Sequence, residues 1–559
     1  LLMNRLCRQC RSAFNLELAD LKILERLSPV INGDKLPLPP PAFCPDCRLR
    51  HRLAFRNQHF IYVRSSGSTS KKLFSVFPEN APFPVIDNEE WWGDSWDAMR
   101  WGQDYDFTQQ FFPQFAALRN LIPHIARNAF GNEECDYCNN IIHSRNCYLS
   151  FNGTKLDGCI HVESAYSTSD CLDCTRMSFC ELCCDCVQCS HCYMLQSSAF
   201  CEQCRDSYFL RNCRSCANCF CCVNLRNKRF CIFNRQHSAE EYTRYLRKLS
   251  LSSFSERQAI ADRFMQFALL HPVPHTYNIN AEESSGCFLD QTKNVHHSFF
   301  IRGGEDLRYC FNLNNGIKDC CDVSIFGESS ELLYECAMSG INCRNLHFCN
   351  ECWMGCTNLL YCMYCVECRN CFGCTGLKRK QFCILNKQYS AEDYYSLVAK
   401  IVVRMEETGE WGAFFPMTLS PLPYNQSLAA YYFPLTQEEC QRQNLCFQHK
   451  RLIEAAQSIS TAELPDGLPE TDGSIVVQSA ASGIPFRITA QEIKRRRAFG
   501  VPLPRTTYDE RMDERSRILG GIAMYRRTCA KTGRSILTAY EPDTPWIVWD
   551  KAVYDREFA

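Results

Sequence analysis

A run of cysteines between Cys135 and Cys231 is the sequence feature that most constrains the fold. This stretch holds 20 of the 42 cysteines, and 18 of those 20 lie on one phase of a three-residue repeat. Other positions of the same phase hold mostly small or apolar residues, such as Ile141, Leu156 and Val162. A step of three residues fits neither an α-helix nor a flat strand. It fits a narrow β-solenoid, because a coil whose length is a multiple of three always points the same phase inward.

Twelve residues is the coil length that the cysteine spacing favours. With twelve residues per coil, Cys135, Cys147, Cys159 and Cys171 form one stacked row. A coil of eighteen residues keeps the same phase inward and is the alternative. A twelve-residue coil with every third residue inward resembles the small disulfide-rich β-helix of beetle antifreeze proteins. The resemblance lies in the spacing alone, since the Thr-x-Thr rows of those proteins are absent, and it implies no activity.

The end of this stretch recurs 152 residues later, which predicts a second solenoid. Residues 216–242 read CANCFCCVNLRNKRFCIFNRQHSAEEY, and residues 368–394 read CRNCFGCTGLKRKQFCILNKQYSAEDY. We therefore expect a mainly β protein with two tandem cysteine-lined β-solenoids, over 133–236 and 285–388. One-residue slips in the second lattice predict bulged coils. These slips fall near Cys320, between Cys336 and Cys343, and between Cys352 and Cys356.

A capping box follows each predicted solenoid: Ser238 with Glu241, and Ser390 with Asp393. A serine followed three residues later by an acidic residue is typical of a helix start. We expect amphipathic helices there that cover the open edge of each last coil. The expected segments are a helical cap and connector over 237–284, and a helical cap, an extended aromatic wrap and a flexible linker over 389–475.

Residues 1–60 contain two CxxC pairs, Cys7 with Cys10 and Cys44 with Cys47. Each pair forms a tight turn that offers two thiolates, and two pairs complete the tetrahedral shell that zinc prefers. We predict a four-cysteine zinc ribbon with one structural ion, because a closed shell leaves no open position for a substrate. Two unrelated CxxC turns, or a redox-active CxxC pair, are the alternatives.

The segment directly after this predicted site is basic and includes Arg48, Arg50 and Arg52. Arginines beside a zinc ribbon could contact the phosphates of a nucleic acid. A helix with one solvated face is the simpler interpretation, and it is the one we favour.

The two ends of the chain are copies of one module. Residues 62–92 align without gaps to residues 525–555, at an offset of 463. We expect a degenerate second ribbon and a Trp-rich connector over 61–132, and a degenerate pair of ribbons over 476–559. The four tryptophans of the connector are expected to pack against the first coil of a solenoid, with a ligand-stacking patch as the alternative.

The ligand positions of the second ribbon do not offer four metal ligands in either copy. We therefore expect ribbons that lack zinc and keep their fold through Tyr, Trp and Pro packing, and we expect Cys529 to be a leftover thiol. The positions are Ser66, Thr69, Asp87 and Glu90 in the first copy, and Cys529, Thr532, Asp550 and Val553 in the last.

Several of these segments together resemble a family of large, cysteine-rich zinc-ribbon proteins from candidate-phylum bacteria. The segments are CRQC, CPDCRLRHRLAFRN, WWGDSWD, EWGAFFPMTLSP and the two solenoid ends quoted above. The resemblance covers most of the chain and implies an architecture with zinc ribbons, but no activity. Members often carry complete CxxC pairs in both terminal modules. Here Ser479, Ser482, Thr507 and Glu510 stand at the four positions of the last module, which argues against a second zinc ion.

Composition narrows the function classes. The net charge is −1, so the chain as a whole does not attract nucleic acid electrostatically. The sequence contains no run of 18 apolar residues, so we predict no transmembrane helix. CxxC pairs without an export signal favour reduced thiols and a cytoplasmic location. The 13 histidines are scattered, and no HExxH motif or Gly-rich phosphate loop indicates an enzyme.

We therefore expect a non-enzymatic zinc-binding scaffold for an unidentified protein partner, with the solenoid cysteines acting as small apolar fillers. A thiolate metal-storage or redox protein is the first alternative. Nucleic-acid binding through the N-terminal ribbon is the second.

Overall fold

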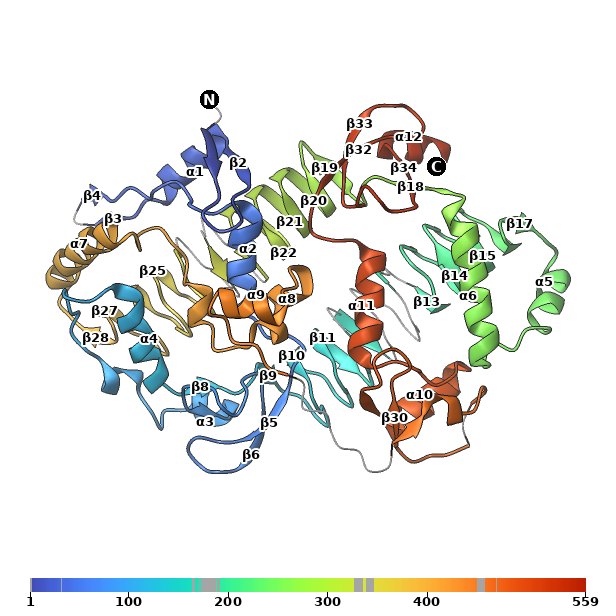
Figure 1. The fold of residues 1–559 in the computed structure, drawn as a ribbon, viewed down its shortest axis with the longest axis horizontal. Coiled ribbons are helices and arrows are strands. Elements are labelled where there is room, and N and C mark those ends of the chain that lie inside the picture. Colours follow the sequence, from blue (N-terminus) through green and yellow to red (C-terminus); the bar gives the residue numbers. More distant parts are fainter. Residues whose placement is uncertain are drawn as a thin grey trace. The chain divides into compact units, whose positions relative to one another are not determined.

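The computed structural model describes residues 3–31, 33–162, 166–169, 172, 187–188, 192–325, 335–337, 346–449, 458–468 and 470–558. The fold is mainly β, and short parallel strands stacked into solenoids dominate it (Figure 1). The chain divides into two compact units. Unit 1 consists of Leu1–Arg127 and Thr276–Gln448, and unit 2 of Asn128–His275 and His449–Ala559. In each unit, a terminal module is thus combined with the solenoid that lies farther from it in sequence.

The first solenoid has twelve residues per coil. Paired residues in adjacent strands, such as Thr154 with Tyr166 and Tyr193 with Arg205, lie twelve positions apart. The predicted coil length is therefore confirmed, and the alternative of eighteen residues is wrong. Its parallel strands are β9 (Ala129–Phe130), β10 (Asn139–Ile142), β11 (Phe151–Asp157), β12 (Tyr166–Ser169), β13 (Tyr193–Gln196), β14 (Arg205–Arg211), β15 (Ala217–Val223) and β16 (Arg229–Ile232), and β17 (Arg235–Gln236) pairs antiparallel with β16.

Left-handed backbone explains how a coil can turn inward every three residues. The residue before each inward position has a positive φ, and asparagine, which tolerates this conformation well, often fills the place. The residues with positive φ therefore recur at the same three-residue step as the inward side chains. In the second coil they are Tyr137, Asn140, His143 and Asn146, with φ between 50° and 53°.

The inward cysteines form the dry interior of the solenoid. Cys219 and Cys222 are fully buried, and they belong to a core that consists mostly of cysteine and leucine. The thiols also hydrogen-bond the coil backbone: Cys213 Sγ donates to the carbonyl of Arg211 and to that of Cys222 in the next coil, both at 3.5 Å. A small side chain with a weak donor thus fills the interior and satisfies backbone acceptors at the same time.

The second solenoid has the same design with extra residues in some coils. Ile301 pairs with Leu313, twelve positions away, whereas Leu307 pairs with Cys320, thirteen positions away, across a bulge. Residues paired across adjacent coils stay thirteen positions apart up to the pair of Trp353 with Val366. After that pair the separation returns to twelve. The predicted slips near Cys320 and between Cys352 and Cys356 are therefore confirmed. The slip predicted at Cys343 lies outside the described residues.

Strands of the second solenoid stack side by side in register, as Figure 1 shows for β20 to β22. The first strand, β19, begins six residues before the predicted start of this solenoid. The strands are β19 (Ile279–Glu282), β20 (Gly286–His296), β21 (Ser298–Arg308), β22 (Phe311–Cys321), β23 (Val323–Ser324), β24 (Cys336–Ala337), β25 (Thr357–Leu360), β26 (Arg369–Phe372), β27 (Gln381–Ile384) and the antiparallel β28 (Lys387–Gln388).

Helices follow both solenoids where the capping boxes predict them. α5 (Ala239–Leu246) begins after Ser238, whose side chain accepts a hydrogen bond from the Glu241 amide, and α6 (Phe254–Leu269) follows it. α7 (Ala391–Thr408) begins after Ser390 in the same way and buries an apolar face. Within the described residues, no helix combines the length and the apolar character needed to cross a bilayer.

The segment after α7 is less extended than the sequence indicates. It contains the short helices α8 (Leu428–Tyr432) and α9 (Gln437–Arg442), together with 3-10 turns at Met417–Leu419 and Tyr424–Gln426. Residues 452–457 and 469 of the expected flexible linker lie outside the described residues. In its described part, β29 (Ile459–Ser460) pairs with the C-terminal module, so this part is not a free linker.

The terminal modules contain matching elements in the same order, except for β3 and β4, which have no counterpart between α10 and α11. The N-terminal module has β1 (Met3–Leu6), β2 (Ala13–Leu16), α1 (Leu18–Leu27), β3 (Val30–Ile31), β4 (Asp34–Lys35), α2 (Pro45–Leu53), β5 (Tyr62–Ser65), β6 (Lys72–Ser75), β7 (Val85–Ile86) and α3 (Asn88–Trp92). The C-terminal module has β30 (Ile475–Gln478), β31 (Pro485–Ile488), α10 (Ala490–Phe499), α11 (Tyr508–Leu519), β32 (Tyr525–Thr528), β33 (Ser535–Thr538), β34 (Ile547–Trp549) and α12 (Lys551–Glu557).

Each module is extended by one strand and one helix that precede a solenoid in sequence. β7 pairs in parallel with β8 (His124–Ile125), and β34 pairs in parallel with β18 (Pro272–Pro274). α4 (Phe111–Leu121) precedes β8, as α6 precedes β18. The duplication therefore extends beyond the ribbons and includes the packing of a module against its neighbouring strand.

The Trp-rich connector packs near the end of the second solenoid, so the expectation of contact with a first coil is wrong. The ring of Trp91 lies 5.9 Å from that of Trp353. The Lys378 ammonium lies 4.7 Å from the Trp91 ring and 4.9 Å from the Trp96 ring. A solenoid lysine thus fills the space between these rings, and this contact fixes the connector on unit 1.

Candidate metal centre

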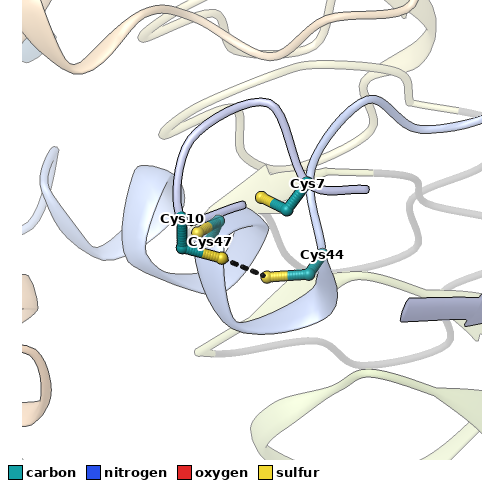
Figure 2. A group of neighbouring side chains, drawn as sticks. All are labelled: Cys7, Cys10, Cys44 and Cys47. Carbon is teal, nitrogen blue, oxygen red and sulfur yellow. Dashed lines mark hydrogen bonds between the residues drawn. The ribbon is translucent and has the colours of Figure 1, made fainter. Parts of the chain in front are cut away.

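The structure brings the four cysteines of the N-terminal ribbon together (Figure 2). The sulfur atoms of Cys7, Cys10, Cys44 and Cys47 all lie within 4.8 Å of one another, and those of Cys10 and Cys44 are 3.6 Å apart. Sulfur ligands bound to one zinc ion lie about 3.8 Å from one another, given Zn–S bonds of about 2.3 Å. The donor set and its spacing therefore fit a tetrahedral ion. Cys10 is exposed, whereas the other three are buried.

Two tight turns position these thiols. Cys7 follows β1, and the turn closes where Arg11, with a φ of 62°, donates its amide to the Cys7 carbonyl at 3.1 Å. Cys44 is the N-cap of α2, with Pro45 at the first helical position, and Cys47 lies in the first turn. Proline at this position favours the helix start and needs no amide partner. Each CxxC pair therefore directs both of its sulfur atoms toward the other pair.

The cluster favours negative charge on at least one sulfur. Hydrogen bonding from Cys47 lowers the pKa of the Cys44 thiol to about 5, and the same contact raises the pKa of Cys47. Four thiolates in one small volume repel one another, so all of them can ionise only when a cation is shared among them. The arrangement can hold a metal ion and, with four sulfur ligands, leaves no position for a substrate.

α2 also docks on the second solenoid, through a buried ion pair. Arg48 Nε lies 2.9 Å from Asp322 Oδ2, and Arg52 Nη1 lies 3.0 Å from Asp322 Oδ1. Arg52 also donates to the hydroxyl of Ser324 at 2.9 Å. All three charged side chains are almost completely buried. The same helix therefore carries two of the cluster's cysteines at its start and two arginines that bind the solenoid of unit 1.

This burial corrects the interpretation of the basic segment. Arg48 and Arg52 do not lie on a solvated helix face, and their guanidinium groups are not available to phosphates, because Asp322 binds both. Arg50 is half-buried, donates to Gln443 Oε1 at 2.7 Å and lies 5.3 Å from the Tyr424 ring. The basic residues next to the cluster thus hold the unit together.

A second set of charges connects α1 to the same solenoid. Arg308 Nη1 lies 3.1 Å from Asp20 Oδ1 and 2.9 Å from Glu17 Oε2, and Tyr309 donates its hydroxyl to Asp20 at 3.2 Å. Sequence analysis did not identify Asp20, Arg308 or Asp322 as docking residues. Their spacing in the sequence does not mark them as docking residues. Only the three-dimensional structure shows which turns of the solenoid face the module.

Residues at the ligand positions of the second ribbons form hydrogen bonds with nearby backbone amides. Asp87 caps α3 by accepting a hydrogen bond from the Glu90 amide at 2.9 Å. In the last copy, Cys529 is buried, and its sulfur accepts a hydrogen bond from the Asp550 amide at 3.1 Å. Within the described part of the chain, Cys7, Cys10, Cys44 and Cys47 are the residues that gather as a metal-ligand group.

In the C-terminal module, the Glu510 carboxylate forms hydrogen bonds with residues that stand at the cysteine positions of the N-terminal module. Glu510 Oε2 accepts hydrogen bonds from the Ser479 hydroxyl at 2.6 Å and from the Thr507 amide at 2.7 Å. Burial alone would raise the pKa of Glu510, but hydrogen bonds from Ser479, Ser482 and Thr507 hold it below its ordinary value. These are the four residues that stand at the cysteine positions. The carboxylate thus joins the turn after β30 to the start of α11 through hydrogen bonds.

No family model matches the chain, and no curated protein is similar to it. The resemblance to cysteine-rich zinc-ribbon proteins therefore stays a prediction.

Replacing Asp322 with alanine should strongly destabilise unit 1. The change removes the buried carboxylate that both arginines contact, and breaking a buried ion pair typically costs about 3–5 kcal/mol. Asp319→Ala is the matched control, because Asp319 forms an exposed pair with Arg26 and should cost less than about 1 kcal/mol. Denaturant unfolding of both variants measures the difference. Equal stability of the two variants would show that the buried pair does not anchor α2.

Glu510→Gln should weaken the C-terminal module without changing metal content. Losing the charge-assisted hydrogen bonds should cost about 1 kcal/mol at pH 7, because the carboxylate is partly exposed. A lowered folded-state pKa contributes stability above the unfolded pKa of about 4.3 and loses it as the pH falls through the folded value. The stability difference between wild type and variant should therefore shrink below pH 4. A difference that is independent of pH would contradict this account.

Proposed function

We propose that this chain is a non-enzymatic scaffold whose N-terminal ribbon binds one structural zinc ion and whose solenoids present surfaces to a protein partner. The observation that carries the proposal is the position of the four-cysteine cluster. Cys44 and Cys47 lie on the same helix as Arg48 and Arg52, and these arginines are buried against Asp322 of the second solenoid. A site with this position supports the attachment of a module.

Zinc is the metal that this donor set favours. Four cysteine thiolates in tetrahedral arrangement are typical of structural zinc sites, and such ions contribute directly to folding free energy. When bound, the ion would cross-link the turn after β1 to the start of α2 and neutralise the thiolates. The residues of the chain then do the rest: Pro45 starts the helix, and the two arginines direct it onto the solenoid.

The hydrogen bonds of the solenoid thiols support the role of fillers over metal storage. Cys374 Sγ donates to the carbonyls of Phe372 and Cys383, both at 3.4 Å, and burial raises the pKa of this thiol. A metal would need the thiolate, so binding would remove the proton that makes these bonds. The burial of Arg48 and Arg52 likewise gives no support to nucleic-acid binding through the ribbon.

Metal analysis of the purified chain tests the proposal. The wild-type protein should contain about one equivalent of zinc, and Cys44→Ser should lose it and unfold at a lower temperature. Cys529→Ser is the control, because Cys529 lies outside the cluster and should leave the zinc content unchanged. Full zinc content in Cys44→Ser, or many equivalents of a soft metal in the wild type, would overturn the proposal.

A further inference from the structure

The two CxxC pairs of the cysteine cluster are held in place in different ways. The second pair belongs to α2, which the buried Arg48 and Arg52 anchor on the second solenoid. The first pair lies in the turn between β1 and β2, which form a sheet of only two strands. An isolated two-stranded hairpin is marginally stable in water. The geometry of the cluster therefore depends on the contacts that hold this turn against α2.

Gln9, between the two cysteines of the first pair, contacts two other elements through its side chain. Its Nε2 donates to Gln443 Oε1 at 3.2 Å, and its Oε1 lies 2.8 Å from His51 Nε2. Because an amide oxygen can only accept, the proton of this second bond lies on His51 Nε2. Arg50 Nη2 donates to the same Gln443 oxygen at 2.7 Å. One chain of hydrogen bonds therefore joins the first CxxC turn, α2 and the end of α9.

Gln443 is itself held in a defined position by α9. It is the C-cap residue of this helix, and its Nε2 donates to the Glu439 carbonyl at 3.3 Å. The helix begins with a capping box at Thr436, and Cys440 within it is completely buried. Supporting residues on packed helices position a site more precisely than residues on loops. The Gln443 oxygen is therefore a well-placed acceptor for the side chain of the CxxC turn.

We propose that Gln443 is a positioning residue of the metal centre, which holds Gln9 and thereby the first CxxC pair in place for the ion. Because the same contact holds the end of α9, metal binding and the docking of α9 stabilise each other, as linkage requires. The inference rests on the proposed zinc site and adds to it a residue 434 positions from the turn that it holds. Removing side chains that orient metal ligands from outside typically weakens metal affinity about 10- to 100-fold.

Zinc affinity of the full chain, measured by competition with a chromophoric chelator, tests this role. Gln443→Ala should weaken zinc binding about tenfold or more. Gln441→Ala is the matched control, because Gln441 is also a glutamine of α9 but is exposed, and it should leave the affinity unchanged. Equal zinc affinities of Gln443→Ala and the control would overturn the inference.

A double-mutant cycle separates positioning from a general loss of stability. Gln9→Ala should also weaken zinc binding, since it removes the other partner of the contact. If Gln443 acts through Gln9, the double variant should lose much less affinity than the product of the two single effects. Single effects that multiply in the double variant would show that Gln443 does not act through Gln9.

Hydrogen exchange tests the reciprocal effect on α9. In the wild-type chain, removing zinc with a chelator should speed exchange at residues 437–446, because the end of the helix loses a fixed partner. Exchange in α5, which belongs to unit 2, should not change. The response of residues 437–446 to zinc should shrink in Gln443→Ala. Exchange at these residues that is the same with and without zinc in the wild type would contradict the coupling.

Zinc content of the wild-type chain, measured on the same samples, separates this test from that of the metal centre. A wild-type chain that binds no zinc refutes the metal centre and this inference together. A wild-type chain with one zinc ion, together with an unchanged zinc affinity in Gln443→Ala, refutes the positioning role alone.

Discussion

The three-residue step of inward side chains is the constraint on which the rest of the structure depends. It requires a left-handed residue before every inward position, a side chain small enough for a narrow interior, and a partner for the carbonyls of each coil. Cysteine meets the last two requirements together, since Cys213 is buried and donates to two carbonyls. Asparagine meets the first at many corners. A coil built this way has little width, so its stability comes from stacking on its neighbours and from what covers its surface and ends.

The terminal modules cover the solenoids, and each docks through the same helix positions. Arg48 and Arg52 of α2 correspond to Arg511 and Arg515 of α11 at the offset of 463. Arg511 lies 3.7 Å from Glu492 and contacts the His161 ring nitrogen at 3.2 Å, whereas Arg48 and Arg52 pair with Asp322. The two modules thus contact their solenoids differently: Arg48 and Arg52 pair with a solenoid carboxylate, whereas Arg511 contacts a solenoid histidine and pairs with Glu492 of its own module.

The two copies of the module use different side chains to join the turn after the first hairpin strand to the start of the following helix. In the N-terminal copy, two CxxC pairs assemble a metal-ligand cluster at the start of α2. In the C-terminal copy, Glu510 accepts hydrogen bonds from Ser479 and Thr507 at the start of α11. Both arrangements place negative charge at a helix N-terminus, where the backbone amides favour it. Hydrogen bonds to one carboxylate therefore join, in the C-terminal copy, the two elements that the cysteine pairs join in the N-terminal copy.

Periodic features could be predicted from the sequence, and long-range pairings could not. The cysteine lattice predicted the solenoids, the twelve-residue coil and two of the bulges, and the CxxC pairs predicted which four cysteines come together. The burial of Arg48 was missed because its partner, Asp322, is distant in sequence and belongs to the solenoid that does not follow the module. The short helices near Tyr424 and Gln437 were missed because that segment has no apolar period. From the sequence, Glu510 was recognised only as a residue at a cysteine position. Its hydrogen bonds with short polar side chains could not be predicted, because such contacts have no characteristic spacing in a sequence.

Counting free thiols before and after unfolding tests the central claim most directly. In the native protein, Cys10 and Cys446 are the exposed cysteines among the described residues, so few thiols should react rapidly with a thiol reagent. After denaturation without a reductant but with a chelator, the account predicts that all 42 cysteines react, because the cysteines of the described residues form no disulfides. Rapid native labelling of many cysteines would contradict an inward-facing lattice, and a count well below 42 after denaturation would contradict its role as a reduced, hydrogen-bonded interior.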